Sequence, residues 1–313
     1  MNNIKLNDIK KILILFMGGI GNMVLFTPAL AALRQRFPDS CITMLVGPFG
    51  AAEMLKGTPY IDEVVVLDSS GGLREGLRLI FRLRRTKFDM SITATGMNPI
   101  KSGLLALLVG VKYRIGENIR GGGFFYNIKT RYDKDKHELD SNLEMLKKIG
   151  IENVRKEPIA WVSKEDEEFA QKCLDKHGIT NSHLVIGIHP GSGRNMSYKR
   201  WAKEKFAAVG DLLVSKYNAK ILIFGGPEEK ELKQFIASEA GDGTMLVTTE
   251  TVLEAAALIA KCSIFVSGDS GLMHIAAAMQ TPIVAIFGPT HPEWVHPYRS
   301  CLLYTSPSPR DLS

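Results

Sequence analysis

The chain has 313 residues, 45% of them hydrophobic, and a formal net charge of +6 at pH 7. A chain of this length is longer than one hydrophobic core usually supports, so we expect two domains. Its longest strongly apolar stretches, such as residues 103–111, are well short of the ~20 residues that a membrane span needs. The short apolar run after the N-terminal lysines leads into glycines rather than a cleavage site, so we expect a cytoplasmic protein without a signal peptide.

The cysteines and paired carboxylates do not indicate a metal site. The cysteines are scattered, without the paired spacing of zinc ligands, and we expect reduced, mostly buried thiols. The Asp-x-Asp pair of Asp133 and Asp135 lies in a charged interval rather than at a strand end, so we assign no divalent metal. The cysteines are Cys41, Cys173, Cys262 and Cys301.

Predicted strands and helices alternate through the first half of the chain. The apolar run at 11–17 predicts a buried strand, and apolar residues at steps of three and four predict a helix from about 22 to 37. Asn22 is an N-cap candidate for this helix, although Pro28 offers two alternatives: a helix that begins there with Thr27 as its cap, or a kink. The further predicted elements are strand 41–46, helix 48–57, strand 63–67, helix 71–86, strand 88–94, helix 98–109 and, after a glycine-rich charged interval at 116–135, helix 137–149.

The turn between the first strand and the first helix is rich in glycine. Gly18, Gly19 and Gly21 surround the predicted start of the helix. Because glycine has no side chain, this strand-to-helix turn allows the backbone to approach a ligand closely.

The predicted helix at 71–86 carries much of the positive charge, with its arginines on one stripe and its apolar residues on another. We expect a surface helix that packs its apolar face into the domain. The alternative is that the arginines contact anionic lipid head groups or anionic acceptors. No aromatic platform accompanies the charge, so we do not expect nucleic acid as a partner. The two stripes are Arg74, Arg78, Arg82 and Arg85, and Leu73, Leu77, Ile80 and Phe81.

Strand–helix alternation resumes in the second half. Ser163, followed by acidic residues at 165–167, is typical of a helix start, and this helix leads into the second domain. The alternation predicts an α/β fold with two doubly wound, Rossmann-like domains facing a cleft, at 1–162 and 163–298, followed by an atypical segment at 299–313. The predicted elements are strand 184–189, helix 201–216, strand 219–225, helix 227–240, a short strand near 245–247, helix 251–260, strand 263–267, helix 271–279 and strand 282–287.

Three loops at predicted strand ends carry residues suited to a phosphorylated ligand, and open parallel sheets bind ligands at these ends. In the first loop, which begins at His189, Gly191, Ser192 and Gly193 can present consecutive backbone N–H groups to phosphate. Lys199 can add a neutralising cation. These features together favour a phosphate site over a merely flexible connection.

The second loop, at 225–231, carries three glutamates before a predicted helix. Glu228, Glu229 and Glu231 satisfy the helix dipole, which alone explains them. The alternative is that one of them hydrogen-bonds the ribose or base of a nucleotide. The loop by itself leaves both interpretations open.

The third loop joins strand 263–267 to the next helix through Asp269, Ser270 and Gly271. A helix N-terminus offers unpaired N–H groups and a positive dipole end, which suit a diphosphate. Asp269 would repel phosphate, so we expect it to cap the helix and accept hydrogen bonds from sugar hydroxyls. His274 follows one turn along on the side of Ser270. The alternative is a plain N-cap and a semi-buried histidine.

These loops in this order, together with the opening turn, resemble glycosyltransferase family nine, the heptosyltransferases of lipopolysaccharide core assembly. The resemblance covers nearly the whole chain, from about Lys10 to Pro297. It rests on an ordered set of short segments, each of which is weak singly. The segments are GGIGNMVLFTPALAALRQRFP, KHELDSNLEMLKKIGI, HPGSG with KRWAKEKFAAV, GGPEEKEL, and SGDSGLMHIAAAMQTPIVAIFGPT.

The resemblance implies a GT-B architecture, in which the first domain holds the acceptor and the second holds the nucleotide-sugar donor. It implies that Lys199 contacts the donor phosphates and that Glu229 contacts the nucleoside. The remaining donor-side residues are Gly191, Ser192 and Gly193 of the first loop, with Asp269, Ser270, Gly271 and His274 at the diphosphate and sugar. The acceptor-side residues are Gly19, Gly21 and Asn22.

The chain departs from the family pattern at two places. The family usually has an acidic residue, the presumed catalytic base, where this chain has Asn22, so the base is left unassigned. After PTHPEWVHPY the family continues through more strand and a closing helix, whereas this chain reads RSCLLYTSPSPRDLS. We expect a truncated or foreign end there, with a natural disordered tail as the alternative.

We therefore expect a metal-independent, cofactor-free, inverting glycosyltransferase that transfers a heptose-like sugar from a nucleotide diphosphate donor, ADP-heptose, to a lipopolysaccharide core or similar lipid-linked acceptor. Catalysis would rest on Lys199, which stabilises the leaving phosphate, and on Asn22, which orients the acceptor hydroxyl. One rival is a nicotinamide-dependent oxidoreductase. It is disfavoured because strand 41–46 ends without the acidic residue that binds a ribose hydroxyl. The other rival, suggested by Asn22, is a non-catalytic nucleotide-sugar binder. We expect a cytoplasmic location with peripheral contact to an anionic membrane face.

Overall fold

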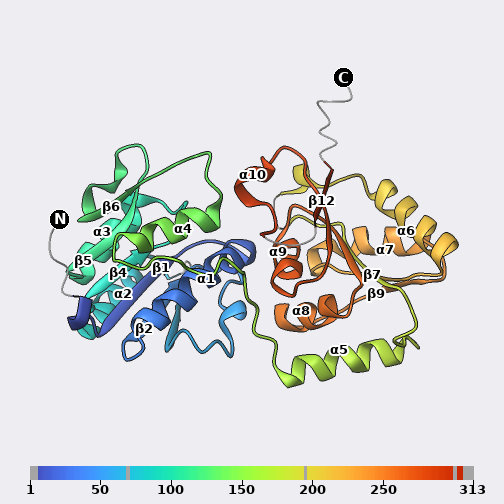
Figure 1. Ribbon diagram of the computed structural model, residues 1–313, viewed down its shortest axis with the longest axis horizontal. Helices are drawn as coiled ribbons and strands as arrows, with labels where there is room; N and C mark the ends of the chain where they lie inside the picture. The colour runs from blue at the N-terminus through green and yellow to red at the C-terminus, as the bar shows by residue number, and fades with distance from the viewer. Residues whose placement is uncertain (1–5, 68–70, 194–195, 299–301, 306–313) are drawn as a thin grey trace. The chain divides into compact units, whose positions relative to one another are not determined.

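The computed structural model describes residues 6–67, 71–193, 196–298 and 302–305 (Figure 1). The chain divides into two compact units, Met1–Lys156 (unit 1) and Glu157–Ser313 (unit 2). This boundary and the predicted one after residue 162 both fall between helices α4 and α5, where the chain forms neither helix nor strand. Each unit is α/β with one parallel sheet, as the alternation predicts.

In unit 1 the sheet has the strand order β3-β2-β1-β4-β5-β6, so β1 is central and the chain returns to its far side at β4. All neighbouring strands are parallel. The strands are β1 (Lys11–Phe16), β2 (Cys41–Val46), β3 (Glu63–Val66), β4 (Met90–Thr93), β5 (Tyr113–Asn118) and β6 (Ile128–Arg131). The helices are α1 (Ile20–Arg36), α2 (Gly72–Thr86), α3 (Pro99–Val109) and α4 (Glu138–Lys147), with short 3₁₀ turns η1 (Leu6–Asp8), η2 (Glu53–Leu55) and η3 (Gly122–Phe125).

In unit 2 the order is β12-β11-β10-β7-β8-β9, which repeats that of unit 1 when strands are counted from the first of each unit. The strands are β7 (Val185–His189), β8 (Lys220–Ile223), β9 (Thr244–Leu246), β10 (Ile264–Gly268), β11 (Ile283–Ile286) and β12 (Leu302–Thr305). The helices are α5 (Lys164–Lys176), α6 (Lys203–Tyr217), α7 (Lys230–Glu239), α8 (Val252–Ala260), α9 (Gly271–Ala278) and α10 (Pro292–Val295), with 3₁₀ turns η4 (Ser197–Lys199) and η5 (Pro227–Glu229).

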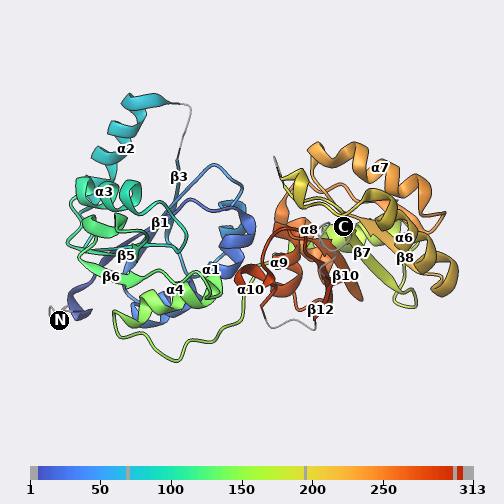
Figure 2. The ribbon, with the colours of Figure 1, turned by 90° about the horizontal axis from the view of Figure 1, so that it is seen from above.

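Helices cover both faces of each sheet. In unit 1, α1 packs with α4 on one face and α2 packs with α3 on the other (Figure 2). In unit 2, α6 packs with α7 and α5 packs with α8. Because both faces are covered, the central strands are buried along almost their whole length, as β1 and β7 show.

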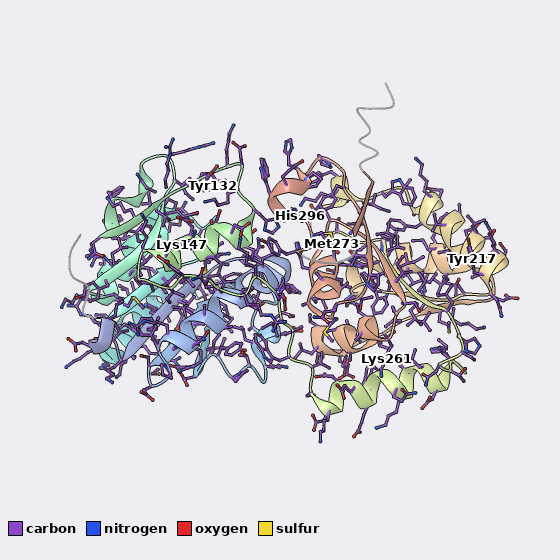
Figure 3. The ribbon with its side chains drawn as sticks, viewed as in Figure 1. Tyr132, Lys147, Tyr217, Lys261, Met273 and His296 are labelled. Carbon is purple, nitrogen blue, oxygen red and sulfur yellow. The ribbon has the colours of Figure 1, made fainter. Side chains whose placement is uncertain are left out.

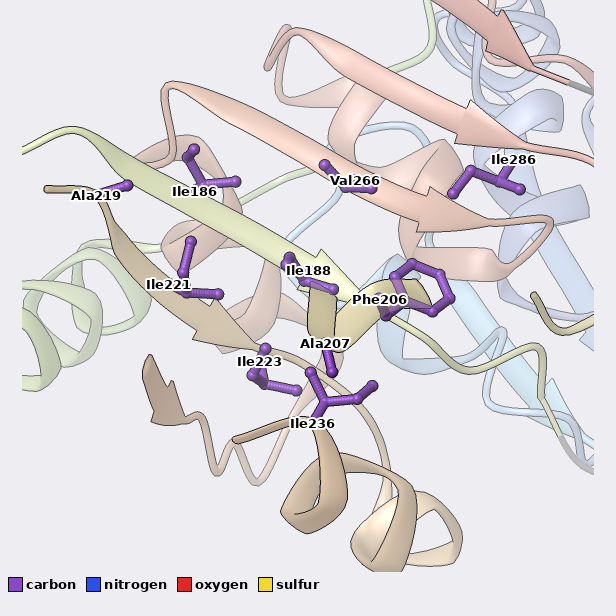
Figure 4. Packing of buried hydrophobic residues seen from close by; sticks show 10 residues of the cluster. All are labelled: Ile186, Ile188, Phe206, Ala207, Ala219, Ile221, Ile223, Ile236, Val266 and Ile286. Atoms are coloured by element: carbon purple, nitrogen blue, oxygen red, sulfur yellow. The ribbon is translucent and has the colours of Figure 1, made fainter. Parts of the chain in front are cut away.

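The core of unit 2 shows how these layers close. Alternate isoleucines of β7 and β8 meet the inner faces of α6 and α7, which contribute Phe206, Ala207 and Ile236 (Figure 4). Ile188, Phe206 and Ile236 have no exposed surface. Burial of each such side chain stabilises the folded state by roughly 1.5–3 kcal/mol. The packed layer therefore holds the ends of β7 and β8 in place, and the strand-end loops start from these ends.

The predicted helix cap is found at α5 but not at α1 or α9. Ser163 caps α5: its Oγ accepts from the Asp166 N–H at 3.2 Å, and the Asp166 carboxylate accepts from the Ser163 N–H at 2.9 Å. In α1 the N-cap is Gly19, and Asn22 is the third helical residue. The prediction that Asn22 is the N-cap is therefore wrong.

Pro28 lies inside α1 rather than at its start. Proline lacks the N–H that would bond the carbonyl of Val24, four residues earlier. The Thr27 hydroxyl replaces it, because Thr27 Oγ1 donates to that carbonyl at 2.7 Å. The alternative in which Pro28 begins the helix is wrong.

Two predicted segments differ in the structure. In place of the helix at 48–57 there is only η2, since Gly50 and Gly57 adopt positive φ values of 78° and 72°, which an α-helix does not accept. The interval 116–135 contains the end of β5, η3 and β6. Gly116 lies in β5. A Cβ at this position would lie 2.4 Å from Tyr126 Cζ, so glycine leaves the room that the tyrosine ring needs.

Helix α2 differs in its packing. Leu73, Leu77 and Phe81 were expected to face the domain, but their exposed fractions are 81%, 47% and 62%. Leu79 and Leu83 instead pack on the core of unit 1. The helix therefore presents apolar side chains beside its arginines at the surface.

The predicted atypical segment at 299–313 is described only at 302–305. These residues form β12, which pairs in parallel with β11 and takes the place that β6 has in unit 1. No strand was predicted there, because four residues among serines and prolines give too short a pattern. The rest of that segment lies outside the described residues.

Candidate functional site

The strand order of each unit defines where a ligand is expected. In open parallel sheets, ligands bind beyond the carboxyl ends of the strands at the point where the strand order reverses. That point lies between β1 and β4 in unit 1 and between β7 and β10 in unit 2. The loops that leave these four strands hold most of the predicted site residues.

In unit 2, His189 at the end of β7 joins the three predicted loops. Its Nδ1 lies 2.9 Å from Ser270 Oγ, and its Nε2 lies 3.2 Å from Glu229 Oε2. An ionised carboxylate only accepts, so Nε2 carries the proton in this contact. The side chain is 4% exposed, and it therefore acts as a buried connection between loops.

Glu229 is the anchor of this network. Oε1 accepts from the Ser192 N–H at 3.1 Å and from Arg200 Nη2 at 3.4 Å. Oε2 accepts from His189 and from the Gly226 N–H, at 3.2 and 3.1 Å. Burial would raise the pKa of this carboxyl, but the hydrogen bond and charge of His189, with Gly226 and Arg200, lower it to about 2. The carboxylate is thus engaged with protein donors, and its predicted contact with a nucleoside stays a prediction.

The first loop is shaped around this carboxylate. A Cβ at Gly191 would lie 1.8 Å from Glu229 Oε1, so glycine is required there. The Ser192 N–H, predicted to face phosphate, donates to Glu229, while its Oγ donates to the Met196 carbonyl at 2.6 Å. Gly193 has a positive φ of 82°. The loop's phosphate-binding role therefore depends on the other N–H groups of the turn and stays a prediction.

Lys199 reaches the start of α9. Its Nζ donates to Asp269 Oδ2 at 2.8 Å, and the two side chains are 17% and 8% exposed. Ser270 caps the helix, since its Oγ accepts from the N–H of Met273, which lies on α9 (Figure 3). The prediction that Asp269 caps this helix is therefore wrong, and the Asp269 carboxylate is instead paired with Lys199. The structure therefore brings Lys199, Asp269 and Ser270 together at one helix N-terminus, with Gly271 as the first helical residue and His274 buried one turn along.

In unit 1, Asn22 contacts a carboxylate that the sequence did not reveal. Asn22 Oδ1 accepts from the Gly19 N–H at 3.2 Å, and Asn22 Nδ2 donates to both oxygens of Glu138 at 2.8 Å. Gly19 and Gly21 stand at the N-cap and the second position of α1. Gly18 is needed because a Cβ there would lie 2.8 Å from Asn22 Cβ.

Glu138 is the first residue of α4 and lies near a second carboxyl, Glu117 of β5. Burial raises the pKa of Glu138 to about 7, and the charge of Glu117 adds to this, while the Asn22 hydrogen bond opposes it. Burial also raises the pKa of Glu117, although hydrogen bonds from Thr95 and Gly96 and the charge of Lys136 oppose that. Two carboxyls with raised pKa values at a strand-end site are typical of acid–base chemistry.

Four residues of these networks were missed from the sequence. His189 and Arg200 lie inside the first loop, and Glu138 lies inside the segment KHELDSN. Their place within segments already assigned to the site was the only feature of the sequence that could have identified them. Glu117 lies in the interval that was not predicted to hold strands. Among the residues that the structure describes, no group of three or more His, Cys, Asp or Glu is placed to hold a metal ion.

Two doubly wound units, one of which holds a lysine and polar side chains at a helix N-terminus at its switch point, are the architecture of the GT-B class of glycosyltransferases. The chain belongs to glycosyltransferase family 9 (heptosyltransferase), whose family model matches residues 77–304. This confirms the predicted family and enzyme class, and it decides against the nicotinamide-dependent oxidoreductase.

Relatives support the assignment to this family over nearly the whole chain. Lipopolysaccharide heptosyltransferase 2 of Salmonella typhimurium is 26% identical over 302 residues, which cover 92% of this chain and 85% of that protein. The crystal structure of a family 9 glycosyltransferase from Veillonella parvula has a TM-score of 0.85 and 26% identity, and the match covers 99% of this chain and 89% of that one. The structure of ADP-heptose lipopolysaccharide heptosyltransferase II from Escherichia coli, at 22% identity, shares the fold, with a TM-score of 0.78 and coverage of 94% and 90%.

Proposed function

We propose that this protein transfers heptose from ADP-heptose to a lipopolysaccharide core acceptor. The relatives described as lipopolysaccharide and ADP-heptose heptosyltransferases support the donor and the acceptor class. The observation that carries the proposal is the pairing of Lys199 with Asp269 at the N-terminus of α9. It places a cation and a sugar-suited carboxylate together where a nucleotide diphosphate sugar needs both.

The donor diphosphate occupies the start of α9. The N–H groups of the first turn, at Ser270 and Gly271, and the positive end of the helix dipole favour its negative charge. Lys199 neutralises the charge that grows on the leaving diphosphate as the bond to the anomeric carbon breaks. Asp269 accepts hydrogen bonds from sugar hydroxyls, and Glu229 keeps the surrounding loops in position.

The reaction inverts the anomeric centre. The oxygen of an acceptor hydroxyl forms a bond to the anomeric carbon from the face opposite the diphosphate, and the electron pair of the broken bond leaves with the diphosphate. The hydroxyl proton must pass to a base. The Asn22 amide forms hydrogen bonds but cannot take up the proton, so its role is to orient groups at the acceptor side.

The acceptor is attached to a lipid, and α2 is the element suited to a membrane surface. Leu73, Leu77 and Phe81 are exposed beside Arg74 and Arg85. Apolar side chains that enter the head-group region and arginines that contact anionic lipids form an interfacial helix. We propose that α2 brings unit 1 to an anionic bilayer; in the described part of the chain no helix has the length and apolar content of a membrane span.

The test is a transfer assay with ADP-heptose and a heptose-accepting lipopolysaccharide core, read by mass spectrometry of the product. Lys199→Ala should lower turnover under saturating donor by on the order of 100-fold, since one preorganised charge-stabilising group is worth about 3 kcal/mol. The control is Lys261→Ala, an exposed lysine of unit 2 (Figure 3), which should transfer at the parent rate. No transfer by the parent, or a Lys199→Ala variant at the normal rate, contradicts the proposal.

A further inference from the structure

Asn22, in the first turn of α1, holds the carboxylate of Glu138, the first residue of α4. Asn22 Nδ2 donates to both oxygens of Glu138 at 2.8 Å, across the packed pair of α1 and α4. Both residues are half-buried. An amide cannot accept a proton at neutral pH, whereas a carboxylate can.

We propose that Glu138 is the general base of the transfer reaction and that Asn22 positions its carboxylate. This rests on the heptosyl transfer proposed above. The proton of the acceptor hydroxyl passes to a Glu138 oxygen as the acceptor oxygen bonds the anomeric carbon, and the electron pair of the broken bond leaves with the diphosphate.

The position of Glu138 is fixed from two sides. Asn142, one turn further along α4, accepts from the Thr95 N–H at 2.9 Å, which ties this helix to the loop after β4. Asn22 ties it to the turn after β1. Both loops stand at the switch point of the sheet of unit 1, where a ligand is expected. A base must be held within hydrogen-bond reach of the proton that it takes, and these two contacts provide that rigidity.

The charges around Glu138 suit a base that works near neutral pH. Burial raises the pKa of Glu138 to about 7, and the like charge of Glu117 of β5 acts in the same direction. On the other side, Asn22 of α1 is neutral and donates to the charged form. Lys136, before α4, acts on Glu117, while Asp140 of α4 is paired with Lys156 at 2.6 Å. A base with a pKa near the working pH combines a populated ionised form with adequate proton affinity.

The experiment is the pH dependence of kcat/KM for heptosyl transfer. The parent should lose activity on the acid side near pH 7 as Glu138 takes up its proton. Glu138→Gln should lower the rate at pH 8 by ~100- to 10,000-fold and abolish this acid limb, because general-base assistance is worth that factor. The control is Glu152→Gln, an exposed glutamate that follows the same helix, which should match the parent.

Two further variants change the charges around Glu138. They test whether Glu138 is the general base even if Glu138→Gln does not fold. Glu117→Gln removes a like charge and should move the acid limb to lower pH. Asn22→Asp places a second carboxyl within hydrogen-bond distance of Glu138 and should move the limb to higher pH, since two such groups share a proton. A structural role for Glu138 would leave the limb unmoved by both changes.

The outcomes separate this proposal from the one on which it rests. Transfer by the parent together with near-normal transfer by Glu138→Gln, or an acid limb that neither Glu117→Gln nor Asn22→Asp moves, overturns the assignment of Glu138 and leaves heptosyl transfer standing. Failure of the parent to transfer heptose overturns both.

Discussion

Glu229 shows how one buried carboxylate holds a set of loops together. Its four hydrogen bonds reach the loop after β7, the turn after β8 and the guanidinium of Arg200, and the side chain is 4% exposed. Through His189 it is also connected to Ser270 at the start of α9. Loss of this carboxylate leaves buried donors without an acceptor, which is more costly than loss of a surface contact.

We predict that Glu229→Gln destabilises unit 2 at pH 7 by about 3 kcal/mol. The pKa of this carboxyl falls from 4.5 when free to about 2 here, and each pKa step of one is worth about 1.4 kcal/mol. The folded carboxylate stays ionised down to about pH 2, whereas the unfolded chain takes up a proton near pH 4.5. The stabilisation is therefore complete above pH 4.5 and is lost as the pH falls toward 2. Urea unfolding of parent, Glu229→Gln and the exposed-site control Glu228→Gln at several pH values measures this. A difference between parent and Glu229→Gln that stays constant from pH 6 to pH 3 contradicts it.

The residues that sequence reasoning found and missed differ in where their partners lie. Lys199, Asp269 and Ser270 were found because each stands in a loop that follows a recognisable buried strand. Glu138 was missed because its partner Asn22 is 116 residues away, and only the packing of α1 against α4 brings the two together. The donor-site roles came partly from the chemistry of these loops and partly from the family resemblance, and they stay predictions.

At the scale of elements, α2 carries a testable consequence of its exposed apolar stripe. We predict that the protein sediments with vesicles that contain phosphatidylglycerol and much less with phosphatidylcholine alone. Replacing Leu73, Leu77 and Phe81 by serine should reduce binding to both, since it removes the side chains that enter the bilayer. Replacing Arg74 and Arg85 by glutamine should reduce only the preference for anionic vesicles, by about 1 kcal/mol per charge.

The matched control for α2 is helix α6 of unit 2, where Leu212→Ser replaces another exposed leucine, 57% accessible, and should leave vesicle binding unchanged. Equal binding of the parent to both kinds of vesicle, or none to either, contradicts the role given to α2. A smaller effect of the leucine and phenylalanine changes than of Leu212→Ser also contradicts it.

Prediction of the elements succeeded where a strand is buried on both faces. The continuous apolar runs of β1, β2 and β7 are recognisable because covered parallel strands have no polar face. Strand β5, whose sequence YRIGEN is largely polar, and the edge strands β6 and β12, of four residues each, lack such runs and were missed. The packing of α2 was also mistaken, because a helical stripe shows which residues lie together but not whether anything covers them.

At the scale of the whole molecule, every group assigned to the donor lies in unit 2. We predict that ADP slows amide hydrogen exchange in the loops after β7 and β10 and in the first turn of α9, and leaves the turn at 18–22 unchanged. ADP at 100 times its Kd should stabilise unit 2 by about 2.7 kcal/mol. Lys199→Ala should need more ADP for the same protection, while Lys261→Ala should not. Protection of the turn at 18–22 with none at α9 would reverse the assignment of the two units.

The shared strand order of the two sheets has a consequence for synthesis on the ribosome. In each unit the first strand made is central, the second and third add outward on one side, and the fourth to sixth add outward on the other. Each new strand therefore joins an edge that already exists, and none has to insert between two paired strands. Unit 1 can complete its sheet while unit 2 is still being translated, as N-terminal domains commonly do. Nascent chains stalled after α6, where all of unit 1 has left the ribosome, should accordingly resist protease within unit 1.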